Sequence, residues 1–143
     1  MSNYNILPHN SVNKYGTATL IRSELIPENL RCDTNGRVQI YNLVNITFAN
    51  IYFDSGTDGI SRNGREKLCS EVLPNLLTNS KNSGYIGGDF NCIIDKKDAT
   101  NNPEQKMSRS LVRLKINQDW KDTFRSLHPV SYTHLTLPTI LLV

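Results

Sequence analysis

Paired cysteines, long apolar runs and a leader-like N-terminus are all missing from this chain of 143 residues. Its three cysteines (Cys32, Cys69 and Cys92) are far apart, and there is no Cys-x-x-Cys pair and no histidine at ligand spacing. This pattern argues against a disulfide framework and against a zinc site. No apolar window reaches membrane-spanning length, and no basic segment followed by an apolar run opens the chain. We therefore expect an intracellular protein with no membrane partner.

Strong net charge is also missing, because the formal net charge is only +3. The excess is uneven: residues 96–125 carry eight Lys or Arg against four Asp or Glu, and the remainder of the chain is slightly acidic. This asymmetry suits a polyanionic partner, and it equally suits a solvated helical face. The length is that of one domain, large enough to bury a core.

The most informative stretch present is residues 85–92, Tyr-Ile-Gly-Gly-Asp-Phe-Asn-Cys. A short apolar strand runs into two glycines, which suit positive φ or a close backbone approach, and then delivers Asp89 and Asn91. On extended backbone both side chains would point the same way, with Phe90 buried behind them. Asp89 can then act as a general base or metal ligand, and the Asn91 amide can donate to an anionic oxygen. The alternative is a Gly-Gly-Asp turn closed by an Asx hydrogen bond.

The clearest β signal covers residues 37–53 and predicts a hairpin with its return near residues 42–45. Both faces of the second strand are largely apolar, so we expect it in the centre of a sheet or between two layers. Asn50 and Tyr52 share one face at its carboxyl end. This polar pair suits a ligand site, whereas the alternative for Tyr52 is a hydroxyl satisfied at the edge of the core.

Residues 65–77 have helical spacing, and Pro74 should kink or split this helix near its last turn. With residues 54–63 as a loop before it and a strand at residues 85–88 after it, the pattern predicts a strand–helix–strand crossover and an α/β layered fold.

The flanking segments give weaker signals. We expect no organised element over residues 1–14, a buried strand at residues 16–21 and a connection over residues 23–35. A short helix is predicted near residues 108–116, followed by an apolar row of Trp120, Phe124 and Leu127, with Asp119 and Asp122 as cap or surface residues.

The chain changes character after residue 129. Residues 130–143 contain no charged residue and end in an apolar run, which is typical of a foreign ending. We therefore divide the chain into a domain over residues 1–129 and an apolar tail over residues 130–143.

Taken together, the motifs resemble the endonuclease/exonuclease/phosphatase superfamily, and within it the apurinic-type endonuclease domain of LINE-type (non-LTR) retrotransposon proteins. The likeness covers roughly Tyr15 to Pro129. It is carried by Gly16-Thr-Ala-Thr-Leu-Ile21, Asn50-Ile-Tyr52, Gly88-Asp-Phe-Asn91, Lys97-Asp98-Ala-Thr100 and Asp119-Trp-Lys-Asp-Thr-Phe-Arg125. The resemblance implies a four-layer α/β sandwich that hydrolyses DNA phosphodiester bonds with Mg²⁺ or Mn²⁺. It also implies a nuclear location and a reverse transcriptase domain further along the full-length protein.

The resemblance assigns roles to three residues. Asp89 is similar to the carboxylate that handles the proton of the attacking water, Asn91 to the amide that holds the phosphate, and Tyr52 to the phenol that contacts a phosphate oxygen. Asp89 and Asn91 are the implied metal ligands, and Asn50 is a supporting residue.

The sequence also departs from the family pattern. The metal-binding Glu that the family places before the strand at residues 16–21 has no counterpart, and neither has the closing Ser-Asp-His triplet. We therefore expect a fragment cut at both ends, inactive by itself and inclined to aggregate or to bind a hydrophobic dye. The alternatives are a phosphomonoesterase of the same superfamily and a non-catalytic remnant that binds nucleic acid weakly.

Overall fold

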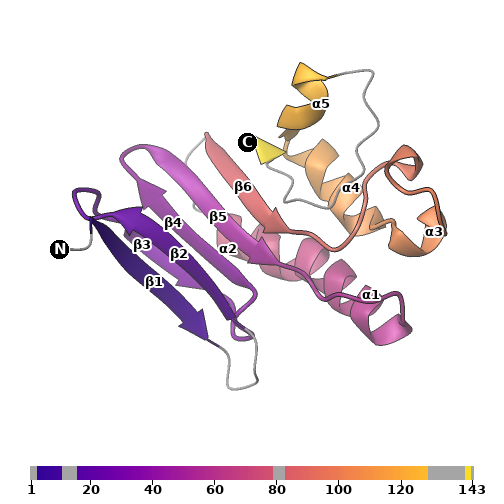
Figure 1. Ribbon diagram of the computed structural model, residues 1–143, viewed down its shortest axis with the longest axis horizontal. Helices are drawn as coiled ribbons and strands as arrows, with labels where there is room; N and C mark the ends of the chain where they lie inside the picture. The colour runs from indigo at the N-terminus through magenta and orange to yellow at the C-terminus, as the bar shows by residue number, and fades with distance from the viewer. Residues whose placement is uncertain (1–2, 11–15, 79–82, 129–140, 143) are drawn as a thin grey trace.

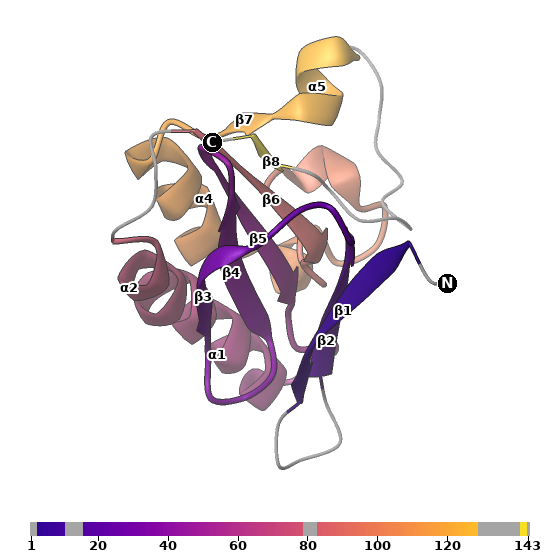
Figure 2. The same ribbon diagram turned by 90° about the vertical axis from the view of Figure 1, so that its left-hand side faces the viewer.

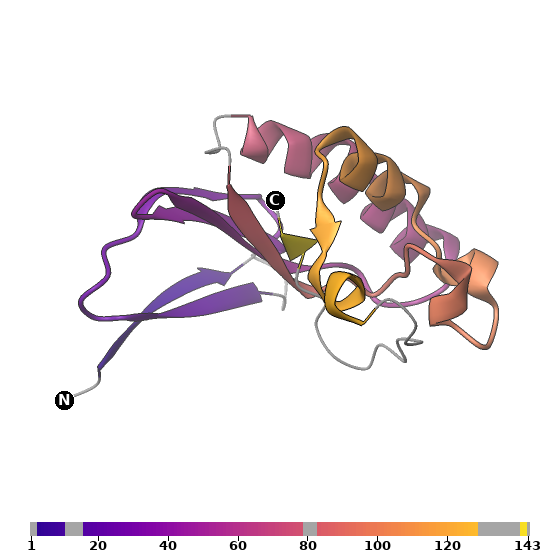
Figure 3. The ribbon, with the colours of Figure 1, turned by 90° about the horizontal axis from the view of Figure 1, so that it is seen from above.

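The computed structural model describes residues 3–10, 16–78, 83–128 and 141–142, and these form three layers. Figure 1, Figure 2 and Figure 3 show the helices α1 (Gly59–Lys67), α2 (Leu73–Leu77) and α4 (Arg109–Asn117) on one face of a central sheet and a two-stranded sheet against the other face. The two-stranded sheet consists of β1 (Tyr4–Asn10) and β2 (Gly16–Arg22). The central sheet has the order β3-β4-β5-β6-β8-β7, with bounds β3 (Glu28–Cys32), β4 (Val38–Leu43), β5 (Ile46–Tyr52), β6 (Gly84–Asp89), β7 (Lys121–Asp122) and β8 (Leu141–Leu142).

The predicted hairpin and crossover form the centre of the molecule. β4 and β5 pair antiparallel through a tight return in which Val44 has positive φ, and β5 and β6 pair parallel. β5 is thus central, as predicted. The main core lies between this sheet and the helices, and it contains residues of both partners: Val38, Ile40, Ala49, Ile51, Phe53, Leu68, Leu73, Ile86, Phe90, Leu111, Leu114 and Trp120.

The crossover helix begins earlier than predicted, because Asp58 caps it. The Asp58 carboxylate accepts the Ser61 N–H at 3.0 Å, which satisfies a free donor of the first turn. The helical run consists of α1 (Gly59–Lys67), a π-helical turn (Leu68–Val72) and α2 (Leu73–Leu77). The irregularity precedes Pro74, as its missing N–H and bulky ring lead us to expect: the Leu73 N–H donates to the Leu68 carbonyl, one residue further back than in an α-helix.

Two predictions for the N-terminal third were wrong. Residues 4–10 form β1, which pairs with β2 along its whole length, and residues 28–32 form β3, which pairs with β4. Neither segment has a clear strand pattern of its own, so the partner strands decide its conformation. β2 is a strand as predicted, yet it is not a buried one, since Ile21 is its only fully buried residue.

The two-stranded sheet contacts the central sheet largely through polar groups. Gln39 of β4 is completely buried, donates to the Leu7 carbonyl at 2.9 Å and accepts from the Thr19 hydroxyl at 3.0 Å. Asn50 of β5 donates to the Ala18 carbonyl at 3.1 Å and to the Thr19 hydroxyl at 3.0 Å. The second layer therefore depends on hydrogen bonds as well as apolar burial.

The C-terminal part contains α3 (Pro103–Lys106), α4 (Arg109–Asn117) and α5 (Thr123–Leu127). α4 matches the predicted helix, and Ser108 caps it through the Leu111 N–H. Trp120 of the predicted apolar row is buried, but Leu127 is 76% exposed, so the row does not include Leu127. Asp122 caps α5 as predicted, but it is buried rather than on the surface.

Of the predicted apolar tail, only Leu141 and Leu142 lie within the described residues. They form β8 between β6 and β7. The division at residue 129 therefore stays a prediction. No helix in the described ranges is long and apolar enough to cross a membrane.

Candidate functional site

An open cleft of about 800 Å³ lies at the carboxyl ends of β5 and β6. The parallel register pairs Tyr52 with Asp89, so the two predicted residues are neighbours at the sheet edge. Asn50 and Asn91 also line the cleft, together with the start of β2 and the loop after β5. Ligands of α/β sheets bind at such strand ends, so all four predicted site residues come together at one candidate site.

Asn91 reaches the cleft by a different route from the one predicted. β6 ends at Asp89, and Asn91 has a left-handed backbone with φ of 46°, so simple strand alternation does not apply. Its N–H donates to Asp89 Oδ1 at 3.0 Å, and its side-chain Nδ2 donates to the Phe53 carbonyl at 2.9 Å. The Asx hydrogen bond of the alternative interpretation is therefore present, and it forms within the cleft wall.

Gly88 explains why the motif contains glycine. Its φ is +141°, and a Cβ added there would collide with the Ile51 carbonyl oxygen of β5. Only glycine accepts this backbone without strain. The positive φ predicted from the sequence is confirmed, and the group that approaches closely is the neighbouring strand.

Tyr52 is held at its ring. The Cζ of Arg37 lies 4.9 Å from the ring centroid, and the Arg37 guanidinium also forms an ion pair with Asp54. Among the described residues the Tyr52 hydroxyl has no hydrogen-bond partner. The alternative of a phenol satisfied at the core edge thus finds no partner for the hydroxyl among these residues.

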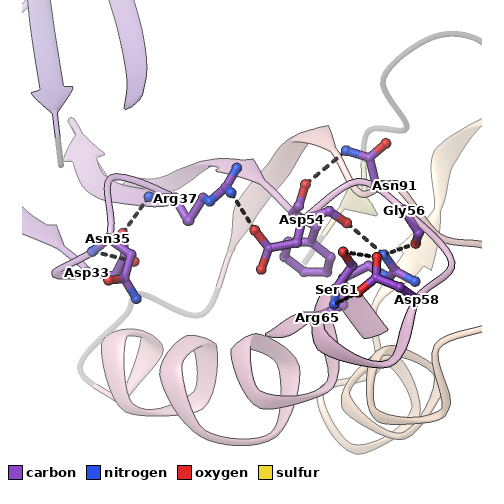
Figure 4. A network of polar contacts seen from close by, with 10 residues as sticks. Asp33, Asn35, Arg37, Asp54, Gly56, Asp58, Ser61, Arg65 and Asn91 are labelled. Carbon is purple, nitrogen blue, oxygen red and sulfur yellow. Dashed lines mark hydrogen bonds and ion pairs between the residues drawn. The ribbon is translucent and has the colours of Figure 1, made fainter. Parts of the chain in front are cut away.

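The loop between β5 and α1 is fixed by a second buried arginine. Arg65 is 3% exposed, and its Nη1 donates to the carbonyls of Asp54 and Gly56, each at 2.7 Å. Figure 4 shows Arg37 and Arg65 approaching this loop from different sides. The Asn91 side chain binds the carbonyl of Phe53, the residue before Asp54. Sequence reasoning missed both arginines, because neither lies in a motif and the only signal is a basic residue beside a polar loop.

The opposite wall of the cleft contains Asp98, whose side chain is 1% exposed and paired with Arg125 of α5. Arg125 also contacts Asp95 at 3.3 Å. The Lys97 N–H, and then the charge of Arg125, lower the pKa of Asp95. Arg125 thus binds both carboxylates, and Asp98, which lines the cleft, is a structural part of its wall.

Cys92 lines the cleft but is not a nucleophile. Burial, with a smaller contribution from nearby carboxylates, raises its pKa to about 12. A thiol with this pKa is neutral at physiological pH, and the thiolate is the reactive form.

The donors in the cleft fit only one way of binding a metal ion. The described residues contain no group of three or more His, Cys, Asp or Glu side chains that could hold one. Asp89 is exposed and the carboxylate of Asp98 is engaged by Arg125, so Asp89 and the Asn91 amide oxygen remain as ligands. Mg²⁺ is often held by one or two carboxylates with water and substrate phosphate, and the cleft fits that arrangement rather than a closed cage of protein ligands.

The layers and the position of the cleft define the class of fold: an α/β sandwich of the exonuclease/endonuclease/phosphatase type. Among solved structures, 97 chains match this fold. The sequence matches no family model, and a search of curated proteins finds no match either.

Three of these structures show how far the likeness goes. A 3'-5' exonuclease (NExo) from Neisseria meningitidis matches with a TM-score of 0.70 and 15% identity, over 98% of this chain and 67% of its own. An AP endonuclease from Archaeoglobus fulgidus matches with a TM-score of 0.69 and 14% identity, over 98% of this chain and 66% of its own. The 3' phosphatase NExo from Neisseria, bound to product DNA hairpin, matches with a TM-score of 0.68 and 16% identity, over 98% of this chain and 66% of its own. The chain thus spans about two thirds of the length of these proteins, and the likeness establishes the fold.

Proposed function

We propose that this chain forms the DNA-binding cleft of a phosphoesterase and carries part of its catalytic set. The observation that carries the proposal is the parallel register that places Tyr52 beside Asp89, with Asn91 bound into the same cleft. The DNA-processing enzymes with the same fold support DNA as the substrate.

Each residue has a distinct task in this proposal. The exposed Asp89 carboxylate accepts a proton from the attacking water, and the Tyr52 hydroxyl donates to a phosphate oxygen. The Asn91 amide has a second N–H besides the one given to Phe53, and this N–H faces the phosphate. When bound, Mg²⁺ or Mn²⁺ supplies positive charge to the phosphate, with Asp89 and Asn91 as its ligands.

Within this class we propose the endonuclease of a LINE-type retrotransposon, working in the nucleus beside a reverse transcriptase domain. The motif resemblance supports this choice. A phosphomonoesterase is the second candidate, and the 3' phosphatase with the same fold favours it. Because the described residues provide a single uncompensated carboxylate in the cleft, we expect slow or undetectable hydrolysis by this chain alone.

DNA binding and hydrolysis, measured side by side, test the proposal. The substrates are supercoiled plasmid and a DNA hairpin with a 3' phosphate, each with Mg²⁺ and with EDTA. The proteins are this chain and its Asp89→Ala, Asn91→Ala and Tyr52→Phe variants. We expect Asn91→Ala and Tyr52→Phe to weaken binding of the hairpin.

The pattern of products distinguishes the candidates. Nicking that Asp89→Ala abolishes supports the endonuclease, and phosphate release without nicking supports the phosphomonoesterase. Binding without hydrolysis is the result expected of a chain that carries only part of the catalytic set, whether it is the endonuclease fragment or the non-catalytic remnant. Binding that none of the cleft variants changes would contradict the proposed function.

A further inference from the structure

The clearest feature that the proposed roles do not use is Arg37, a buried cation immediately before β4. Its guanidinium lies over the Tyr52 ring at 4.9 Å and pairs with Asp54. A desolvated cation over an aromatic face is attracted by the ring quadrupole, so this contact restrains the ring plane.

The backbone of Arg37 is fixed on both sides. Asp33 Oδ1 accepts the N–H groups of Arg37 and Val38, each at 2.7 Å, and the Arg37 carbonyl accepts the Tyr52 N–H at 2.8 Å. Figure 4 shows this chain of contacts from Asp33 through Arg37 to Asp54. The guanidinium therefore starts from a position that cannot shift without breaking several hydrogen bonds.

The far end of the guanidinium is fixed as well. Asp54 pairs with it, and Asp54 itself lies so close to Gly64 of α1 that a Cβ there would collide with its carboxylate. The Asp54 carbonyl is held by Arg65 at 2.7 Å. Sheet and helix thus both determine where the Arg37 charge lies.

From these contacts we propose that Arg37 is a positioning residue for Tyr52, with Asp54 as its support. Tyr52 lines the cleft, its ring is held from one face, and its hydroxyl has no partner among the described residues. Such an arrangement presents the phenol to a phosphate oxygen with little freedom to lose on binding. This inference rests on the proposed function of Tyr52.

A double-mutant cycle on DNA binding tests it. The probe is the hairpin with a 3' phosphate, at fixed salt, with dissociation constants from fluorescence anisotropy. We expect Arg37→Met and Tyr52→Phe each to weaken binding about tenfold, as for a hydrogen bond to a charged group. The double variant should then be within about twofold of either single variant, because Arg37 acts through the hydroxyl.

Matched variants separate positioning from charge and from stability. Arg37→Lys keeps the charge and loses the planar stack, so it should bind like Arg37→Met. Asp54→Asn keeps the guanidinium over the ring, so it should lose less affinity for the hairpin than Arg37→Met does. Arg22→Met removes an exposed cation paired with Glu24 and should change binding less than twofold. Melting curves identify any variant that fails to fold.

A second readout does not depend on DNA. With 4-fluorophenylalanine at position 52, the fluorine resonance should shift between the parent chain and Arg37→Lys. An unchanged resonance would overturn the inference. Additive losses in the cycle would overturn it while leaving the proposed function in place. A Tyr52→Phe variant with normal binding would overturn the inference together with the proposed role of Tyr52.

Discussion

Two unusual backbone positions flank Asp89. Gly88 has φ of +141° and Asn91 has φ of 46°, and Asn is one of the few residues with a side chain that tolerates the left-handed region. Such conformations persist where the surroundings impose them, and they gather at functional sites. The strand edge on one side and the Phe53 carbonyl on the other impose them here.

Replacing Gly88 should therefore be costly. We expect Gly88→Ala to lower the free energy of unfolding by about 2–4 kcal/mol, because Ala adds both φ strain and a collision with Ile51. Urea unfolding measures this loss of free energy. Gly59→Ala is the control, since a Cβ at Gly59 meets nothing within 4 Å, and it should change stability by less than about 1 kcal/mol. Equal effects of the two substitutions would contradict the argument.

At the scale of elements, α1 and α4 are joined by one carboxylate. Glu66 accepts the Ser110 N–H at the start of α4, at 2.9 Å. Burial raises the pKa of Glu66, but the hydrogen bonds from Ser110 and Ser108 outweigh it, and the net pKa is lowered. The ionised form is thus the one that holds the two helices together.

This link between α1 and α4 predicts a pH-dependent contribution to the free energy of unfolding. A lowered folded pKa gives stability that is present above the unfolded pKa and is lost as the pH falls through the folded value. Glu66→Gln should cost about 0.5–1 kcal/mol at pH 7, discounted because the group is half-exposed. The cost should disappear as the pH falls from about 5 to 3. Thermal melts across pH measure it, with the exposed Glu71→Gln as control, and a cost independent of pH would be inconsistent with the link.

The docking of β1 and β2 is a second property of elements. Gln39→Leu should leave the Leu7 carbonyl and the Thr19 hydroxyl without their buried partner, at about 1–3 kcal/mol for each group. We expect amide hydrogen exchange to quicken in β1 and β2 while β4, β5 and β6 keep their protection. The exposed Gln105→Leu is the control. Uniform loss of protection would mean that the two-stranded sheet does not open by itself.

At the scale of the whole molecule, the outer face of the β1–β2 sheet is an apolar surface. Ile6 and Leu20 are cross-strand partners, 63% and 65% exposed, and Tyr4 lies on the same face. Such a surface favours association. The expectation of dye binding therefore has a specific location in the fold.

Charging this face should suppress association. The double variant Ile6→Lys, Leu20→Glu places opposite charges across one strand pair, so the sheet is preserved. We expect binding of a hydrophobic dye to fall severalfold and light scattering to show fewer aggregates. Ile60→Lys on α1 removes a separate exposed apolar side chain, 86% exposed, and should have little effect. If both variants lowered dye binding equally, the surface that drives association would not be the outer face of the β1–β2 sheet.

The hairpin, the parallel crossover and the polar residues at the ends of β5 and β6 could all be predicted from the sequence. Each is a local pattern of alternating or helical spacing that determines its own element, and the order of elements along the chain then determines which strand ends meet. The sequence by itself therefore determined the α/β class and the location of Tyr52, Asp89 and Asn91 at one edge.

Only the tertiary structure decided the rest. β1 and β3 are strands because β2 and β4 pair with them, and Asn91 turns toward Phe53 because a carbonyl 38 residues away accepts its amide. The contacts of Arg37, Arg65 and Arg125 likewise join segments that carry no local sign of each other. Pairings of this kind depend on distances in space that no spacing along the chain encodes.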